Sequence, residues 1–145
     1  MNLLNNDLKN AKNILDSGEY TCVLCKDDDI VLGKEKGVRP LVELIEDEKE
    51  YNGFSAADKI VGKAAAHLYI LLKVSSVYAV VMSMEAEKLL SQHNIETSYD
   101  ILTDSIINRK GNDICPMEKA VKGIEDSQTA FCKIKETIEL LRSRQ

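Results

Sequence analysis

The segment NDICPMEKAV, residues 112–121, places a cysteine directly before a proline at the predicted start of a helix. Proline is favoured at the first helical position, so Pro116 makes Cys115 the N-cap and Glu118 the third residue of the helix. A helix N-terminus stabilises the thiolate, which is the nucleophilic form of cysteine. Cys115 is therefore a candidate nucleophile, with Glu118 as a candidate acid. The alternative interpretation of Cys115 is a small buried hydrophobe.

Two further features bear on the reactivity of Cys115. Cysteine is a poor N-cap compared with Ser, Asp or Asn, which suggests that the thiol is there for its own chemistry. In the preceding loop, Arg109 and Lys110 would assist the thiolate if the loop folds back, whereas Asp113 would oppose it. A partnering base cannot be identified from the sequence, so both interpretations stay open.

The segment GFSAADKIVGKAAAHLYILL carries the second group of candidate site residues, and its pattern predicts a helix over residues 55–72. Ser55 and Asp58 have the spacing of a capping box, with the serine as N-cap. Gly62 in the middle of a helix costs about 1 kcal/mol relative to alanine. We therefore expect another element or a ligand to approach the backbone closely at Gly62.

Lys63 has two interpretations in this predicted helix. It lies on a line with Lys59 and His67 at four-residue steps, which is typical of a solvated helix edge. Alternatively, it faces a site entered from the helix N-terminus, where free N–H groups and the positive dipole end suit phosphate or carboxylate groups. Asp58 either stabilises the helix or acts in the site by accepting a proton. The candidate ligand-binding residues are Ser55, Gly62 and Lys63.

The composition excludes some classes of partner. The chain has 24 acidic and 19 basic residues, a net charge of -5 and no Trp. A general nucleic-acid binder needs a basic surface to displace counterions from phosphates, so we expect no nucleic-acid partner. The longest apolar stretches are interrupted by charged and polar residues and are too short to span a membrane. The N-terminal residues lack a basic segment followed by an apolar run, which predicts a cytoplasmic protein.

The four cysteines do not indicate a metal or disulfide framework. Without a secretion signal, free thiols are expected. Cys22 and Cys25 form a Cys-x-x-Cys pair, but they lie in a predicted strand, where residues three apart point to opposite faces. A zinc knuckle would need a second ligand pair, and the sequence has none. We expect no metal and no cofactor.

The remaining elements follow from hydrophobic periodicity and turn residues. The pattern predicts a first helix over residues 4–15, a β-hairpin over 20–37, a short helix over 40–45, a strand over 75–83, a helix over 84–94, a strand over 96–102, a helix over 115–123 and a final amphipathic helix from 126. A hairpin followed by alternating helices and strands predicts three-layer α/β/α packing on a mixed sheet, in a single domain over residues 1–145.

This order of elements resembles the cytidine deaminase-like fold. The segments GFSAADKIVGKAAA and ICPMEKAV also resemble an uncharacterised bacterial and archaeal family assigned to that fold, known only as a domain of unknown function. The resemblance covers about residues 8–140. It implies a pocket shaped to accommodate a nucleotide.

The zinc deaminases carry His-x-Glu or Cys-x-Glu at the start of the small-residue helix and Pro-Cys-x-x-Cys at the start of the next. The matching positions here read ADKI at residues 57–60 and MSME at residues 82–85. Neither position supplies a histidine or thiolate ligand, so zinc-dependent hydrolytic deamination is not expected.

Two functions remain open from the sequence. One is an enzyme that acts on a nucleotide-like or other anionic small molecule without zinc, with Lys63 binding anionic groups, Asp58 as base or orienting group, and Cys115 with Glu118 as nucleophile and acid. The other is a ligand-sensing module on the same scaffold without catalysis. A protein-interaction role through the final helix is a further alternative. The sequence does not predict the oligomeric state.

Overall fold

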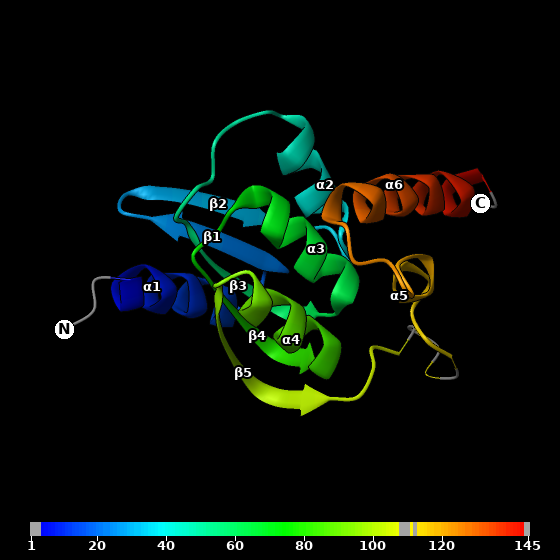
Figure 1. The fold of residues 1–145 in the computed structure, drawn as a ribbon. Coiled ribbons are helices and arrows are strands. Elements are labelled where there is room, and N and C mark those ends of the chain that lie inside the picture. The colour runs from blue at the N-terminus through cyan, green and yellow to red at the C-terminus, as the bar shows by residue number, and fades with distance from the viewer. Residues whose placement is uncertain (1–3, 108–110, 112, 144–145) are drawn as a thin grey trace.

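The computed structural model describes residues 4–107, 111 and 113–143, so Arg109 and Lys110 lie outside the described residues. Along the chain the elements are α1 (Leu4–Asp16), β1 (Cys22–Lys26), β2 (Asp29–Gly33), α2 (Arg39–Glu46), β3 (Ser55–Val61), α3 (Lys63–Leu72), β4 (Ser76–Ser83), α4 (Met84–Gln92), β5 (Glu96–Thr103), α5 (Pro116–Ala120) and α6 (Ser127–Ser143) (Figure 1).

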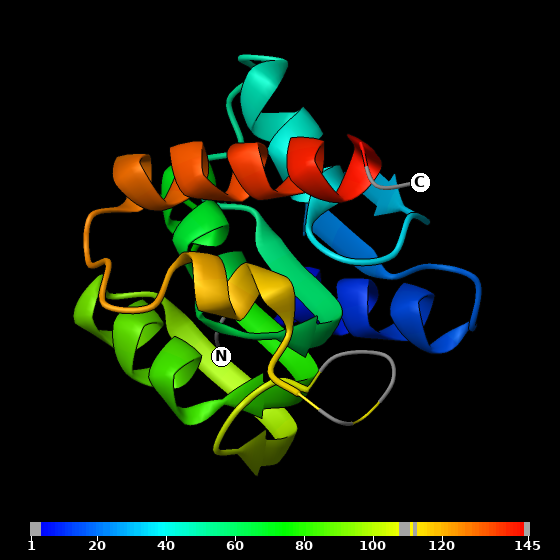
Figure 2. The same cartoon turned by 90° about the vertical axis from the view of Figure 1, so that its right-hand side faces the viewer.

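The strands of the described part of the chain form one mixed sheet in the order β2-β1-β3-β4-β5. β1 runs antiparallel to both β2 and β3, whereas β3, β4 and β5 are parallel to one another. Helix α1 packs on one face of the sheet, and α2, α3 and α4 pack on the other, as Figures 1 and 2 show. The predicted fold class, three-layer α/β/α on a mixed sheet, is confirmed.

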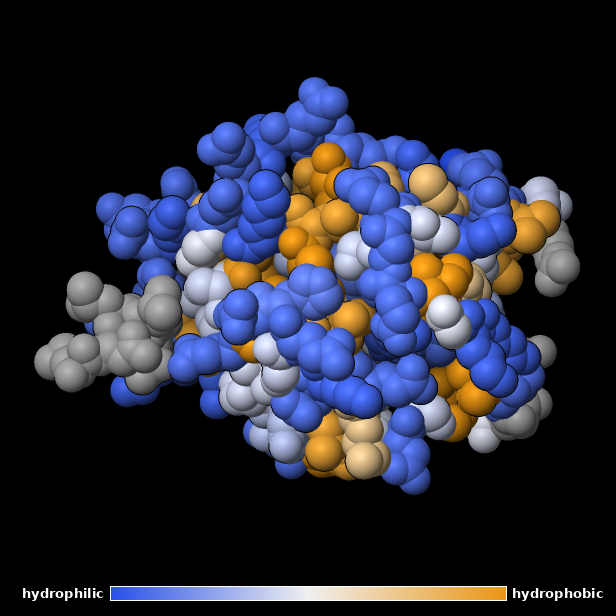
Figure 3. Space-filling model, in the orientation of Figure 1, coloured by the Kyte–Doolittle hydropathy of each residue, from blue (hydrophilic) through white to orange (hydrophobic). Residues whose placement is uncertain are grey.

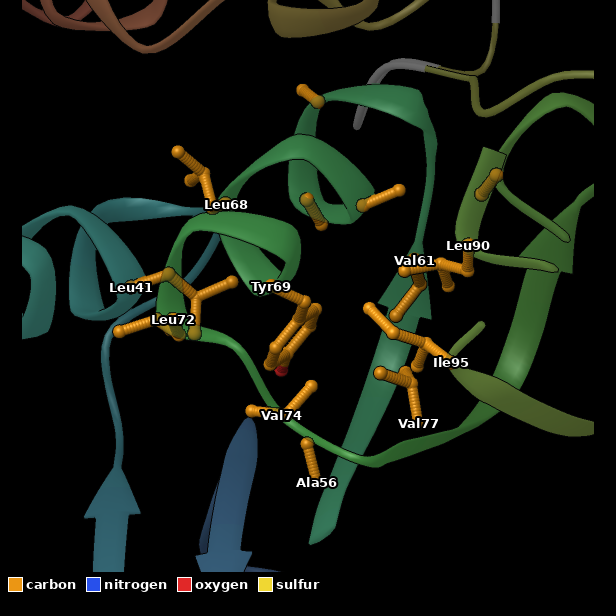
Figure 4. Close-up of a cluster of buried hydrophobic side chains, with 14 of the residues drawn as sticks. Leu41, Ala56, Val61, Leu68, Tyr69, Leu72, Val74, Val77, Leu90 and Ile95 are labelled. Carbon is orange, nitrogen blue, oxygen red and sulfur yellow. The ribbon is translucent and has the colours of Figure 1, made fainter. Parts of the chain in front are cut away.

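Each face of the sheet has its own hydrophobic core. The larger core lies around α3, with Tyr69 of α3 pointing toward the sheet, where Ala56 and Val77 of the strands lie (Figure 4). The smaller core joins Ala11 and Leu15 of α1 to the opposite face. Because strand side chains alternate between faces, β1 contributes to both cores.

The alternation of β1 confirms the prediction about its two cysteines. Cys22 belongs to the core under α3, and Cys25 belongs to the core under α1. Both side chains are buried and free. The two thiols therefore lie on opposite faces of the sheet and do not form a chelating pair.

The predicted helix over residues 55–72 is wrong in its first half. Residues Ser55–Val61 form strand β3, paired with β1 on one side and β4 on the other, and the helix begins only at Lys63. Tertiary pairing in the middle of the sheet overrides the local helical pattern. Ser55 is therefore not an N-cap, Asp58 is not in a capping box, and Gly62 precedes the helix instead of interrupting it.

The other elements agree with prediction to within a few residues. Helix α3 is largely buried, with the small residues Ala64, Ala65 and Ala66 among its buried positions.

No described helix combines the length and apolar character that a bilayer crossing requires. Hydrophilic residues cover most of the face seen in Figure 3, and apolar residues appear between them in small groups.

Candidate functional site

The N-terminus of α3 holds the carboxylate of Glu118. Gly62 is the N-cap residue, and its extended backbone (φ −101°, ψ −173°) leaves the first amides of the helix free of helical partners. The N–H groups of Lys63 and Ala64 donate to the two carboxylate oxygens of Glu118 at 2.7 and 2.9 Å. We call these two N–H groups, with Gly62, the α3 cradle. It binds one carboxylate through both of its oxygens.

The Glu118 carboxylate occupies the space in which a side chain at position 62 would begin. A Cβ atom at this position would lie 2.5, 2.6 and 2.7 Å from the Oε1, Cδ and Oε2 atoms of Glu118. Real Cβ atoms essentially never come so close to another heavy atom. A group does approach Gly62 closely, but at the start of the helix and not in its middle as predicted, and that group is the Glu118 carboxylate.

Lys63 places a nearly buried cation beside the cradle. Its side chain is only 9% exposed, and its ammonium lies 3.9 Å from the carboxylates of both Glu85 and Glu125. These two glutamates are well exposed, at 69% and 78%. Both distances are beyond hydrogen-bonding range. In the described part of the chain every fully buried side-chain nitrogen or oxygen has a hydrogen-bond partner, so the tip of Lys63 reaches solvent. The ammonium is thus paired only loosely.

The charges around the cradle act on Glu118 in both directions. Burial raises the pKa of Glu118 above its usual value, and the negative charge of Glu85 adds to this rise. The amides of Ala64 and Lys63 and the Lys63 ammonium lower the same pKa. Burial has the largest effect on the pKa of Glu118. The hydrogen bonds and the Lys63 charge therefore offset only part of the cost of removing this carboxylate from water.

Cys115 is the N-cap of α5, as predicted, and is half-buried. Its backbone N–H donates to the carbonyl of Ile106, and its side chain makes no capping hydrogen bond. The predicted opposing charge, Asp113, pairs with Lys119. Among the described residues, no hydrogen bond links the Cys115 thiol to another candidate residue.

Asp58 belongs to a separate cluster under α3. Its carboxylate accepts hydrogen bonds from the Tyr69 hydroxyl at 2.7 Å and from the Ile60 N–H at 3.3 Å. Cys22 lies opposite Asp58 on the neighbouring strand. Burial raises the pKa of Asp58 to about 7, although the hydrogen bonds from Tyr69, Ile60 and Lys59 lower it. Burial, with a smaller contribution from Asp58, also raises the pKa of the Cys22 thiol.

Ser55 lies at the opposite end of β3 from the cradle. It is completely buried, and its hydroxyl oxygen accepts a hydrogen bond from the Ser76 hydroxyl. Gly62 follows it by seven positions, or about 23 Å at the usual rise of about 3.3 Å per strand residue. The structure therefore brings together Gly62, Lys63 and Glu118, and it places Ser55 and Asp58 elsewhere.

A contact that the sequence gave no sign of joins α3 to the start of α6. The imidazole of His67 is completely buried, with Nδ1 2.9 Å from the Ser127 hydroxyl and Nε2 3.0 Å from the Ile124 carbonyl. A carbonyl only accepts, so Nε2 carries the proton and Nδ1 accepts from Ser127. Burial lowers the pKa of His67. His67 is thus a structural residue, and the interpretation of Lys59, Lys63 and His67 as a solvated helix edge is wrong, since Lys59 lies in β3 and the other two are buried.

The two helix starts that were matched to the zinc-ligand motifs from the sequence can now be located. The first falls at Gly62-Lys63-Ala64, not at residues 57–60, and the second begins at Ser83, which caps α4 by accepting from the Ala86 N–H. In the ranges that the structure covers, no three or more His, Cys, Asp or Glu side chains cluster in a way that could hold a metal ion.

These features define an α/β domain with a carboxylate-binding helix N-terminus at the carboxyl end of a central parallel strand. Residues 10–138 match the family described as TM1506, a domain of unknown function (DUF1893), and the chain belongs to this family. The predicted membership of a family of unknown function is confirmed.

Comparison with solved structures agrees with this membership. A DUF1893 family protein from Thermotoga maritima (TM1506) superposes with a TM-score of 0.78 and 28% identity, covering 97% of this chain and 90% of that one. A dCMP deaminase from the cyanophage S-TIM5 superposes with a TM-score of 0.46 and 12% identity, covering 68% of this chain and 99% of that one. No curated protein matches the chain.

Proposed function

We propose that this protein binds a small molecule carrying a carboxylate or phosphate group at the α3 cradle, and that it does so as a zinc-independent, non-catalytic module. The observation that supports this proposal is the two-oxygen capture of a carboxylate by the Lys63 and Ala64 N–H groups. Backbone N–H groups and the helix dipole favour any anion of this shape. The Glu118 carboxylate, which these N–H groups hold within the chain, supports a carboxylate or phosphate as the group that a ligand would present.

The Lys63 ammonium supplies the second part of the proposed site. It is nearly buried, and its two carboxylate neighbours are well exposed side chains at 3.9 Å. A ligand anion in hydrogen-bonding distance would interact with this ammonium more strongly than either glutamate does. The nucleotide-like class of ligand comes from the resemblance of the sequence to deaminase-like domains.

The arrangement of the other candidates favours binding over catalysis. Asp58 is engaged with Tyr69 in the core, and both oxygens of Glu118 are engaged with backbone N–H groups. A nucleophile needs a base within hydrogen-bonding reach. Among the described residues, the Cys115 thiol has no such partner, so the enzyme hypothesis has less support than the binding module.

Isothermal titration with adenosine 5′-monophosphate (AMP) tests the proposal, with adenosine as the control that lacks phosphate. We expect AMP to bind and adenosine to bind at least tenfold more weakly, since a charge-assisted contact contributes about 1.5–3 kcal/mol. Lys63→Gln should weaken AMP binding by about tenfold for the same reason. Lys88→Gln, which removes an exposed lysine on the neighbouring helix α4, should leave it unchanged. Equal binding of AMP and adenosine would refute the proposal.

A further inference from the structure

We propose that the outer edge of β5 is an interaction surface for a second copy of this chain, whose own β5 pairs with it as an antiparallel strand about a two-fold axis. In the described part of the chain, β5 is the last strand of the sheet and pairs with β4 alone, and it lies along the lower margin of the molecule in Figure 1. Within those residues its outer N–H and C=O groups are open to a further strand. This interface does not depend on a ligand in the α3 cradle.

The two edges of the sheet differ in their protection. Edge strands of native proteins are commonly short, or carry Lys, Pro or a bulge, which prevents pairing with another chain. The edge strand β2 has five residues and is flanked by DD at residues 27–28 and KEK at residues 34–36. The edge strand β5 has eight residues, ETSYDILT, and contains no Lys, Arg, Pro or Gly. The β5 edge is therefore the one suited to pairing.

β5 also exposes apolar side chains that a partner strand would cover. Tyr99 and Leu102 are 40% exposed, and Ile101 is 56% exposed. Ile101 ends a row of apolar residues on three neighbouring strands, since it lies beside Val81 of β4, which lies beside the exposed Ile60 of β3. A further strand at this edge would cover the outer flank of Ile101 and remove apolar surface from water.

The charges on β5 favour one register for this pairing. In an antiparallel pair with a two-fold axis, one residue lies opposite its own copy. A centre at Asp100 sets two Asp100 carboxylates opposite each other, and a centre at Ser98 sets Glu96 opposite Asp100, although like charges directly opposite are destabilising. A centre at Tyr99 avoids both contacts, because Asp100 then lies opposite Ser98 of the second copy. In the same register Glu96 lies opposite Leu102.

The register centred on Tyr99 also pairs most of the strand. It sets residues 96–102 of the two copies opposite one another, whereas a centre at Ile101 does so only for residues 99–103. The two Tyr99 side chains meet at the axis, and aromatic pairs across strands are stabilising. The proposed contact is therefore a dimer whose two sheets join at β5 with Tyr99 at its centre.

Substitutions at Ser98 test the interface and its register together, and each acts twice because the interface is two-fold. Ser98→Asp sets a second carboxylate opposite Asp100 and should weaken dimerisation by about tenfold. Ser98→Lys sets an ammonium there and should strengthen dimerisation by about tenfold. Leu32→Asp and Leu32→Lys, at an exposed position of the β2 edge, are the matched controls and should change nothing. Sedimentation velocity across the micromolar range measures the dimerisation constant.

A disulfide provides a second measurement that does not depend on surface charge. Residues opposite each other in an antiparallel pair have Cα atoms about 4.5–5.5 Å apart, which a disulfide spans. Tyr99→Cys in a Cys132→Ser background should therefore link two copies on oxidation with copper–phenanthroline, and mass spectrometry should find the linked peptide. Ile101→Cys in the same background is the control, since it lies opposite Thr97 and not opposite its own copy.

The outcomes separate this interface from other contacts. Opposite shifts for the two Ser98 variants, with cross-linking of Tyr99→Cys but not of Ile101→Cys, support the proposal. A wild-type protein that stays monomeric over the whole concentration range overturns it, and so does a dimer that neither Ser98 variant changes. Cross-linking of Ile101→Cys in place of Tyr99→Cys overturns the register. If the Ser98 variants do not fold, the wild-type sedimentation and the cross-link decide.

Discussion

The hydroxyl of Tyr69 donates a hydrogen bond of 2.7 Å to the carboxylate of Asp58, across the interface between α3 and β3. Tyr69 is completely buried in the larger core. The pair therefore holds a half-buried acid against the core, in a cluster with Cys22 and apart from the cradle. Because burial shifts the pKa of Asp58, this residue should make the free energy of unfolding depend on pH.

Asp58 should make the domain less stable as pH rises from about 4 to about 7. The pKa of Asp58 is about 7 in the folded protein, whereas its ordinary value, which applies to the unfolded chain, is 3.8. Between these two pH values the folded state binds a proton that the unfolded chain has released. The free energy of unfolding therefore falls as pH rises through this range. Asp58→Asn removes this titration, so its stability relative to wild type should increase between pH 4 and pH 7. Urea unfolding at several pH values measures the difference.

A constant difference between Asp58→Asn and wild type over this range of pH would mean that the Asp58 carboxylate does not titrate in this window.

Gly62→Ala should change the sign of its effect when Glu118 is shortened. In the wild type the new Cβ would lie 2.5 Å from Glu118 Oε1, so the end of the flexible Glu118 side chain must shift. We expect a loss of about 1–3 kcal/mol, because this shift weakens the hydrogen bonds from the Lys63 and Ala64 N–H groups to the carboxylate. The backbone of Gly62 has a negative φ that alanine tolerates. In a Glu118→Ala background the substitution should stabilise by about 0.4–1 kcal/mol, because alanine restricts the unfolded chain. A double-mutant cycle by denaturant unfolding measures both values, and equal effects in the two backgrounds would show that Glu118 does not fill this space.

His67→Leu should destabilise the domain by about 1–3 kcal/mol, because the Ile124 carbonyl and the Ser127 hydroxyl lose their buried partner. Ser127→Ala leaves only Nδ1 of His67 without a partner and should cost less. The double variant should lose less stability than the sum of the two single losses, since both substitutions remove the same hydrogen bond. Additive losses in thermal unfolding would argue against the His67–Ser127 bond.

The four cysteines should differ in their reaction with iodoacetamide. Cys132 is exposed and Cys115 is half-buried, whereas Cys22 and Cys25 are buried. Burial also raises the pKa of Cys22 and Cys25, which lowers their thiolate fraction. Mass spectrometry of the native protein should therefore show Cys132 modified first, Cys115 more slowly, and Cys22 and Cys25 only after unfolding. Modification of Cys115 faster than Cys132 would revive its role as a nucleophile.

The fold could be predicted well from the sequence because most of its signals are local. Alternation placed Cys22 and Cys25 on opposite faces, and Pro116 marked the start of α5. The main error was at residues 55–61, whose small and apolar residues suit a helix as well as a strand. Pairing with β1 and β4 decides the structure there. Gly62 marks the true boundary between β3 and α3, and a glycine within a helical pattern can indicate such a boundary.

The candidate site could be predicted only in part. Lys63 and Glu118 were both singled out, each from its place near a helix N-terminus, but nothing local joins two residues 55 positions apart. The same is true of His67 and Ser127, which are 60 positions apart. Ser55 and Asp58 were grouped with Lys63 on the assumption of one continuous helix. The strand separates them from it.

The binding of an anion at the α3 cradle is tested most directly by a ¹H–¹⁵N NMR titration of the wild-type protein with AMP. The two N–H groups of the proposed site belong to Lys63 and Ala64, which bind Glu118 in the structure. Phosphate bound in its place should move both of these resonances and saturate. Adenosine should leave them in place. AMP-dependent shifts confined to other parts of the chain, or no shifts at millimolar AMP, would contradict the assignment of the ligand site to the cradle.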